Sequence, residues 1–305
     1  MLVFLRKRLI AAGIAVLLVT LIIFVLARIQ GDPRTLYLVD NNVSQEMYDA
    51  LGRELGLDKP IVVQYVLFLG RLVRGDLGIS IHEHRPVLDI VLERLPNTLQ
   101  LAGAAFVLSL LVGVPMGVLS AVQRGRIWDL VGRMFAVLGH SLPSFWVGIM
   151  LIFVFAVKLR WLPAFGHGGP SHFILPAIAL GWASAGAQMR LVRSAMLETL
   201  GSQYVILARA KGVGHARVIF HHALRNALLA PLTFAGLTIG GLITGAIITE
   251  TVFAWPGLGT LAINSVASSD YAVLQGTMVI ITLFYIGSSL CVDLIYGLVD
   301  PRIRL

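Results

Sequence analysis

Apolar residues along this chain gather in six long runs with polar stretches between them. The runs cover residues 9–27, 98–122, 134–157, 173–189, 226–249 and 271–292, and none contains Asp, Glu, Lys or Arg. Each approaches the roughly 20 residues that a helix needs to cross a bilayer core about 30 Å thick. The runs are far longer than barrel strands, and lipid requires backbone polar groups to be paired within the protein. The pattern therefore predicts an all-α integral membrane protein with six transmembrane helices.

Composition agrees with burial in lipid. The chain has 305 residues, of which 57% are hydrophobic and 13% charged, and its formal net charge is +8. A soluble domain usually carries about 25% charged residues, so lipid must cover part of this surface. Positive charge often indicates a nucleic-acid partner, but in a membrane protein it is typical of cytoplasmic loops, which collect Lys and Arg. We therefore expect the lipid bilayer, and no nucleic acid, as a partner.

The distribution of charge predicts the orientation of the spans. The segment 30–97 holds seven basic and ten acidic residues, whereas cations collect before residue 9, between the second and third runs, at 190–225 and after 292. By the positive-inside rule, the chain starts in the cytoplasm, crosses six times and ends in the cytoplasm. We expect a multi-pass protein of the cell (inner or plasma) membrane.

The chain divides into three predicted parts. These are an N-terminal transmembrane helix (1–29), an external helical segment (30–94) and a transmembrane core (95–300). In the external segment, an amphipathic helix begins at Pro60 and meets a stop at Gly75, and Pro86 opens a second short helix. Between Glu250 and Asp270 the chain is rich in Gly, Pro and Ser, which predicts an outer loop or a re-entrant piece shielded by protein.

The loop 197–225 has its own pattern. Helical spacing runs to Lys211, where Gly212 and Gly214 allow a tight turn before a second helix. Arg209 and Lys211 supply a cationic rim, and the small residues Ala208 and Ala210 allow a partner to approach closely. The residues alone fit both a generic basic cytoplasmic loop and a docking element.

This loop resembles the EAA loop of type I ABC importer permeases, and more narrowly that of the dipeptide/oligopeptide/nickel branch. The resemblance rests on Ala208-Arg-Ala-Lys-Gly212 and His222-Ala-Leu-Arg-Asn-Ala227, and Ile206-Leu207 depart from the family's Glu-Ala-Ala opening. Further stretches resemble the family in the same order along the chain: Gly31-Asp32-Pro33, Leu55-Gly-Leu-Asp-Lys-Pro60, Gly75-Asp-Leu-Gly78, Leu95-Pro96-Asn-Thr98, Ser141-Leu-Pro-Ser-Phe-Trp146, Trp161-Leu-Pro163, Glu250-Thr-Val-Phe-Ala-Trp-Pro-Gly-Leu-Gly259 and Asp300-Pro-Arg302.

The resemblance implies a transport subunit without enzymatic activity. Its expected partners are a paralogous second permease subunit, two ATPase subunits and an external substrate-binding protein. The chain contains no G-x-x-x-x-G-K-[ST] loop, and ATP and Mg²⁺ are expected on the ATPase subunits, with no cofactor in this chain. The resemblance implies di- or oligopeptides as the cargo, with nickel, glutathione, an opine or an oligosaccharide as the alternative. The residues expected to couple to the ATPase are Leu207, Ala208, Arg209, Ala210, Lys211, Gly212, Val213 and Gly214.

A few other residues are candidates for the pathway or its gating. Glu250 lies at the outer end of a span, where an ionisable group indicates function, and His140 precedes a kink expected at Ser141 and Pro143. The eight histidines lack a supporting Cys/Asp cluster, so we expect no metal site. No H-E-x-x-H occurs and Ser184 does not fit G-x-S-x-G, so a membrane enzyme is disfavoured. The remaining alternative is a self-sufficient channel or secondary carrier, which would move substrate in liposomes without ATPase subunits.

Overall fold

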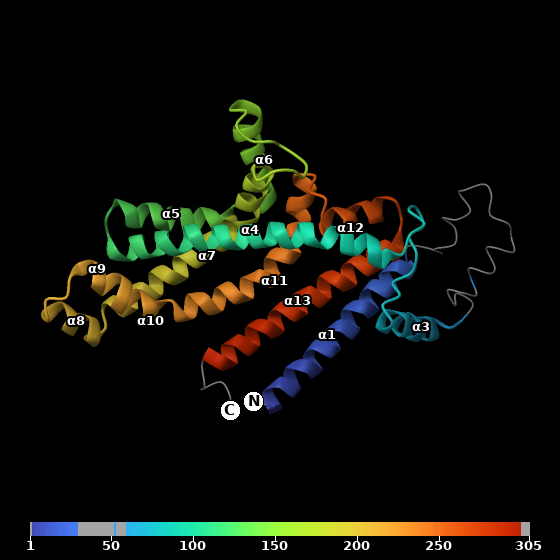
Figure 1. The fold of residues 1–305 in the computed structure, drawn as a ribbon, viewed down its shortest axis with the longest axis horizontal. Coiled ribbons are helices and arrows are strands. Elements are labelled where there is room, and N and C mark those ends of the chain that lie inside the picture. Colours follow the sequence, from blue (N-terminus) through green and yellow to red (C-terminus); the bar gives the residue numbers. More distant parts are fainter. Residues whose placement is uncertain (1, 30–51, 53–58, 300–305) are drawn as a thin grey trace. The chain divides into compact units, whose positions relative to one another are not determined.

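The structure is a computed structural model that describes residues 2–29, 52 and 59–299 (Figure 1). Within those residues the regular elements are helices, with one isolated bridge between Ile79 and Pro86. This confirms the all-α prediction. Most of the expected external stretch 30–58, and the C-terminal Asp300-Pro-Arg302 motif, lie outside the described residues. The described residues fall into two compact units, one within positions 1–97 and 256–286 and the other within positions 98–255 and 287–303.

The first unit contains α1 (Leu2–Ile29), α3 (Ile61–Val73), the first turns of α4 (Val87–Val122), α12 (Leu258–Ala267) and the first half of α13 (Tyr271–Val299). The amphipathic helix expected after Pro60 is α3, and it ends where Gly75 takes a positive φ of 77°. Its Tyr65 hydroxyl donates a hydrogen bond to the Leu17 carbonyl at 2.8 Å. The rings of Phe24, Tyr65 and Phe68 pack together beside that bond. Helix α3 is therefore held against α1.

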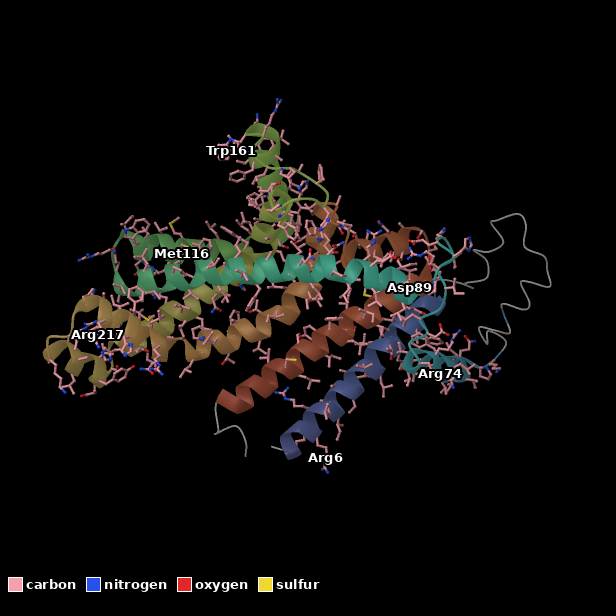
Figure 2. All side chains as sticks on the ribbon, viewed as in Figure 1. Arg6, Arg74, Asp89, Met116, Trp161 and Arg217 are labelled. Carbon is pink, nitrogen blue, oxygen red and sulfur yellow. The ribbon has the colours of Figure 1, made fainter. Side chains whose placement is uncertain are left out.

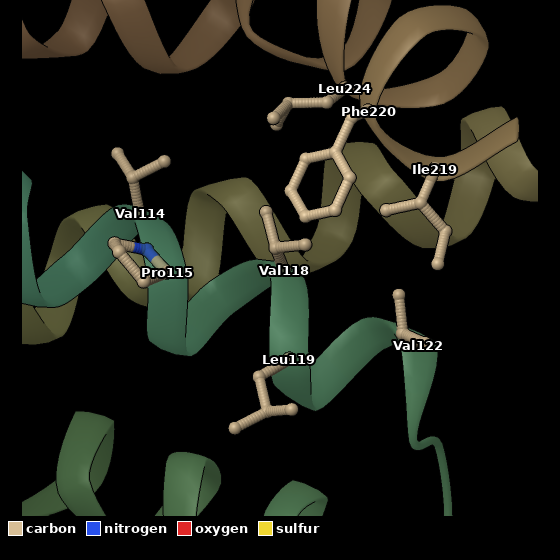
Figure 3. Close-up of a pocket in the computed structure, with 8 residues that line it drawn as sticks. All are labelled: Val114, Pro115, Val118, Leu119, Val122, Ile219, Phe220 and Leu224. Carbon is tan, nitrogen blue, oxygen red and sulfur yellow. The ribbon is translucent and has the colours of Figure 1, made fainter. Parts of the chain in front are cut away.

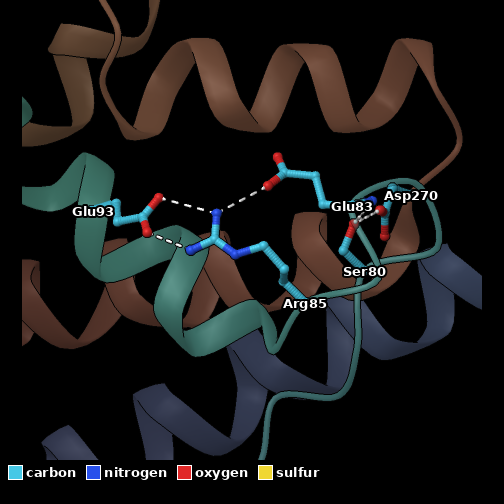
Figure 4. A network of polar contacts seen from close by, with 5 residues as sticks. All are labelled: Ser80, Glu83, Arg85, Glu93 and Asp270. Carbon is cyan, nitrogen blue, oxygen red and sulfur yellow. Dashed lines mark hydrogen bonds and ion pairs between the residues drawn. The ribbon is translucent and has the colours of Figure 1, made fainter.

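Two polar contacts fix the connection between α3 and α4 (Figure 4). Asp270 is buried and accepts hydrogen bonds from the Ser80 hydroxyl at 2.6 Å and from the Ile81 N–H at 3.1 Å. Arg85 pairs with Glu93 on α4 and lies 3.5 Å from Glu83. The hydrogen bond and charge of Glu93 raise the pKa of Arg85 above its usual value. The connection between α3 and α4 is thereby held by a buried contact at Asp270 and an exposed ion pair at Arg85.

The short helix expected to open at Pro86 is not a separate element. The structure places Val87, Ile90 and Val91 in the first turns of α4, which continues unbroken to Val122. The expected boundary between residues 94 and 95 therefore falls inside a single helix. Pro96 lies within α4, and its neighbours on both sides keep helical geometry. Helices of membrane proteins tolerate a proline where other groups satisfy the freed backbone carbonyl.

The second unit contains the rest of α4, then α5 (Ile127–Ser141), α6 (Ser144–Leu151), the π-helix η2 (Ile152–Lys158), α7 (Ser171–Leu200), the loop elements and α11 (Leu229–Val252). Glycines set the contacts of α7. A Cβ on Gly117 of α4 would lie 2.8 Å from the Met189 carbonyl oxygen, and one on Gly139 of α5 would lie 3.1 Å from the Gly186 Cα. Helices α4 and α5 therefore touch α7 almost backbone to backbone, as small residues permit in membranes.

The expected kink at Ser141 and Pro143 is confirmed as a complete break. Helix α5 ends at Ser141, Leu142 is extended, and α6 starts at Ser144 with its axis bent by 109° from α5. Pro143 lacks an N–H and forces the preceding residue out of the helical region. The third apolar run is therefore a bent pair of helices, not a straight span.

By length and composition, four helical segments can cross a membrane: Arg6–Leu26, Val87–Val122, Leu229–Val252 and Tyr271–Val292. The bent pair would make a fifth. The predicted fourth span, residues 173–189, lies in α7, which does not meet the criterion. Its first half is uncharged but rich in Ala, Gly and Ser, which have low hydropathy, and its second half carries Arg190, Arg193 and Glu198. The described helices thus give four or five spans by this measure, and the expected count of six depends on α7.

Between Glu250 and Asp270 the structure has a turn followed by the ten-residue helix α12, which is too short to cross a membrane. Trp255 in the turn is fully buried, and its ring packs edge-on against His167 and Phe173 at 4.7 and 4.6 Å between centroids. The segment fits the expected outer loop or re-entrant piece.

Candidate functional site

The expected coupling loop contains a short helix, α8 (Gln203–Ala210). It follows α7 after only Gly201 and Ser202, and the Ser202 hydroxyl donates to the Thr199 carbonyl at 2.6 Å. The helix ends in a glycine cap. The Gly212 N–H donates to the Arg209 carbonyl at 2.9 Å, and the Val213 N–H donates to the Ala208 carbonyl at 3.2 Å. Gly212 has a φ of +80°, the left-handed conformation that such a cap requires and that glycine adopts without strain.

Helix α8 presents one anchored and one open face. Val205 is fully buried, whereas Ile206 and Leu207 are each 55% exposed and Tyr204 is 45% exposed. The Tyr204 oxygen accepts a hydrogen bond from the Asn226 amide at 3.0 Å. The helix is therefore fixed at Val205 and Tyr204, and its large apolar side chains at 206 and 207 face away from the fold.

After the turn, the chain returns through α9 (His215–Arg217), the π-helix η3 (Val218–Leu224) and α10 (Arg225–Ala227). Figure 2 labels Arg217 at the α9 end of this loop. The returning segment is packed by a cluster of apolar side chains drawn from α4, α7, η3 and α10: Val118, Ala121, Val192, Met196, Ile219, Ala223 and Ala227. The loop is thus a rigid extension of α4 and α7.

An apolar groove of about 370 Å³ runs between the end of α4 and η3 (Figure 3). Only apolar side chains line it: Val114, Pro115, Val118, Leu119, Val122, Ile219, Phe220 and Leu224. Phe220 is 64% exposed at its edge. Among the described residues, the side chains that line this groove are all apolar.

The residues expected to couple to the ATPase lie together on α8 and its turn. Leu207, Arg209, Ala210, Lys211, Gly212 and Gly214 are exposed, while Ala208 and Val213 are half-buried. They form one continuous surface.

The three residues named for the pathway do not share an environment. His140 and Pro143 are exposed at the end of α5 and at the break that follows. Glu250 is fully buried near the end of α11 and accepts a hydrogen bond from the Thr98 hydroxyl of α4 at 2.6 Å. Glu250 therefore ties α11 to α4.

The histidines do not gather around a common point. Among the described residues, no group of three His, Cys, Asp or Glu side chains is arranged to hold a metal ion. His221 and His222 have their rings perpendicular, with centroids 5.3 Å apart. His82 faces the Ser268 carbonyl at 2.8 Å, and His167 packs on Trp255.

Sequence reasoning missed a charged cluster near this loop. Asp129 of α5 is 2% exposed and accepts hydrogen bonds from Arg193 of α7 at 2.8 and 3.1 Å. It also accepts one from the Ser120 hydroxyl of α4 at 2.7 Å. A signal was present, because Asp129 is the sole acidic residue between positions 98 and 197 and sits among cations.

Two family descriptions match almost the whole chain. Residues 113–305 match "binding-protein-dependent transport system inner membrane component", and residues 1–102 match the N-terminal part of the same kind of membrane component. The chain is 38% identical to the dipeptide transport system permease protein DppB of Escherichia coli strain K12, with 94% of each chain covered. It is 40% identical to a putative peptide permease protein of Brucella suis, covering 99% of this chain and 98% of that protein.

A third relative is the glutathione transport system permease protein GsiC of Escherichia coli O6:H1. It is 36% identical, and the match covers 100% of this chain and 99% of that protein. Among solved structures, the inward-facing MetNI methionine ABC transporter matches with a TM-score of 0.59 at 20% identity, covering 69% of this chain and 96% of that one. That likeness concerns the fold. Because its relatives are permease proteins, the chain is a transport subunit and not an enzyme. The chain belongs to the family of binding-protein-dependent transport system inner membrane components and is a type I ABC importer permease.

Proposed function

We propose that this permease carries di- or oligopeptides delivered by an external binding protein. Support comes from the peptide permeases that are 38–40% identical over nearly the full length of both chains. The glutathione permease at 36% identity makes glutathione the second candidate. Nickel, an opine or an oligosaccharide is a weaker alternative, since the relatives named above are peptide and glutathione permeases.

The proposed assembly places this chain beside a paralogous permease subunit, with two ATPase subunits on the cytoplasmic side and a binding protein outside. ATP and Mg²⁺ are bound by the ATPase subunits. Both termini of this chain face the cytoplasm, an orientation supported by the loop cations at Arg124, Arg126 and Arg133 and at positions 190–225.

The surface of α8 and its glycine turn is the proposed docking site for the ATPase. One observation carries this assignment: Ile206 and Leu207 are each 55% exposed on a helix that packs through the buried Val205 and is hydrogen-bonded at Tyr204. Arg209 and Lys211 lie next to this pair. An apolar centre with a charged rim is the usual composition of a protein interface, and a rigid helix loses little entropy when it docks.

The test uses the complete transporter in proteoliposomes, with labelled dipeptide, the binding protein and ATP. Leu207→Ala removes exposed apolar area without disturbing the fold. Loss of an interface anchor typically costs about 1–2 kcal/mol or more, so we expect peptide uptake and ATPase stimulation by the binding protein to fall several-fold.

The matched control is Leu229→Ala at the start of α11, where the side chain is 57% exposed and lies outside the loop. It should transport like the wild type. Full uptake by the Leu207→Ala complex would contradict the docking assignment, and wild-type complexes that ignore dipeptides but accumulate glutathione would contradict the peptide assignment.

A further inference from the structure

A buried ion pair joins three helices of the second unit, and the function proposed above does not use it. Asp129 is 2% exposed at the start of α5. Arg193 of α7 donates to both of its oxygens, from Nε to Oδ1 at 2.8 Å and from Nη2 to Oδ2 at 3.1 Å. Such bidentate pairs are the most directional of charged contacts.

Helix α4 and its turn complete the site. The Ser120 hydroxyl donates to Asp129 Oδ1 at 2.7 Å, and the Gly125 N–H donates to Oδ2 at 2.9 Å. Arg193 Nε also reaches the Ser120 oxygen at 3.1 Å. The carboxylate is thus bound by α4, by the turn after it and by α7.

Close packing extends from the ion pair along α7. A Cβ on Gly132 of α5 would lie 2.4 Å from the Met189 Cε, and one on Gly117 of α4 would lie 2.7 Å from the Val192 Cβ. The glycines leave little room for a side chain at these points, so the helices pack closely and sliding one past another would produce clashes. The three helices can move together more easily than apart.

Arg193 is also close to the coupling loop in sequence. It lies seven residues before Leu200, the end of α7, which is about 10 Å of helix at 1.5 Å per residue. Gly201 donates hydrogen bonds to the carbonyls of Leu197 and Glu198, at 3.3 and 3.2 Å. Only Gly201 and Ser202 separate α7 from α8, so a displacement of α8 moves α7 directly.

We propose that Asp129 and Arg193 are positioning residues that lock α4, α5 and α7 into one block, so that a displacement of α8 reaches the break between α5 and α6. The inference rests on the proposed role of α8 as the docking site. Separating the helices would leave a buried charge without its partner, which is strongly unfavourable. The block therefore carries the motion to Pro143, at the 109° bend between α5 and α6.

The test measures peptide molecules transported per ATP hydrolysed in the reconstituted complex. Asp129→Asn and Arg193→Gln should lower this ratio about 2- to 30-fold, the range expected when a coupling network is disturbed, while basal ATP hydrolysis persists. The double variant should be no worse than the more impaired single variant, because both substitutions remove the same contact.

Arg133→Gln is the matched control. Arg133 lies 3.7 Å from the same Asp129 oxygen, but it is 56% exposed and sits on the same helix as Asp129. Losing it removes a charge next to Asp129 without releasing a second helix, so the ratio should stay at the wild-type value.

A second measurement needs no variant of the ion pair. In a Cys291→Ser background, spin labels at Arg124→Cys and Glu198→Cys report the distance between the α4–α5 turn and the end of α7. The distance should be the same in nucleotide-free complexes and in ATP-trapped complexes, which are identified by their arrested hydrolysis.

A changed label distance, or an unchanged transport ratio in assembled Asp129→Asn complexes, would overturn the inference. If Leu207→Ala impairs coupling while Asp129→Asn does not, only the proposed block of α4, α5 and α7 is contradicted, and the docking role of α8 stands. If Leu207→Ala is also without effect, the docking assignment of α8 fails first.

Discussion

At the scale of single residues, glycines decide how closely the helices of the second unit approach. Gly117 on α4 faces Val192 and the Met189 carbonyl of α7, and a Cβ there would lie 2.7–2.8 Å from them. A Cβ on Gly103 of the same helix would meet no heavy atom within 4 Å. Two glycines of one helix therefore have different roles, which their shared apolar surroundings in the sequence do not reveal.

Gly117→Ala should destabilise the protein. The added methyl group cannot be accommodated unless α4 moves away from α7, and overpacking of this kind costs about 1–3 kcal/mol. Thermal unfolding of the protein in detergent should show a lower Tm than the wild type. Gly103→Ala, which meets open space, should leave the Tm unchanged or raise it slightly, and equal Tm values for both variants would contradict the close-approach argument.

At the scale of elements, backbone chemistry decides where helices stop. Pro143 ends α5, and Gly212 caps α8, both as the sequence predicts. These outcomes are predictable because a missing N–H or a positive φ acts within a few residues. The start of α4 is different. The sequence predicts a separate helix after Pro86, yet α4 continues through Pro96 into the span.

Asp270 shows how a side chain secures an element from a distance. It accepts from the Val273 N–H at 3.3 Å, in the first turn of α13, and from Ser80 on the outer connection. Asp270→Ala should remove this cap, at a cost of about 0.5–2 kcal/mol, and release the connection. Hydrogen–deuterium exchange should speed up in residues 79–86 and in the first turn of α13.

Glu83→Ala is the control for that experiment, since the Glu83 side chain is exposed and its carboxylate lies 3.5 Å from Arg85. In the Glu83→Ala variant, the exchange rates of residues 79–86 and of the first turn of α13 should match those of the wild type. Protection that survives in Asp270→Ala would mean that apolar packing alone holds the connection.

At the scale of the whole molecule, hydropathy and charge predict the number and the direction of the crossings. Four helices and the bent pair meet the criterion for spans, while α7 contains Arg190 and Arg193 in its second half. The packing of Gly181 and Gly186 against α4 and α5 shields the first half of α7. A helix shielded by protein needs less hydropathy than one that faces lipid.

The orientation can be tested at Val73, the last residue of α3, which is 88% exposed. In a Cys291→Ser background, Val73→Cys should react with an impermeant thiol reagent in intact cells, because α3 belongs to the segment predicted outside. Arg209→Cys on α8 should react only after the membrane is opened. The reverse pattern would invert the predicted topology.

The sequence by itself determines the class of the protein, the approximate spans, the break at Pro143 and the helix–turn of α8 with Gly212. Each depends on hydropathy over about 20 residues or on backbone chemistry within a single turn, so neighbours along the chain suffice. Only the tertiary structure decides that Asp129 pairs with Arg193, 64 residues away, and that Glu250 binds Thr98 at a separation of 152. A buried charge is satisfied by whichever partner the packing brings within reach, and that choice depends on which glycines allow which helices to touch.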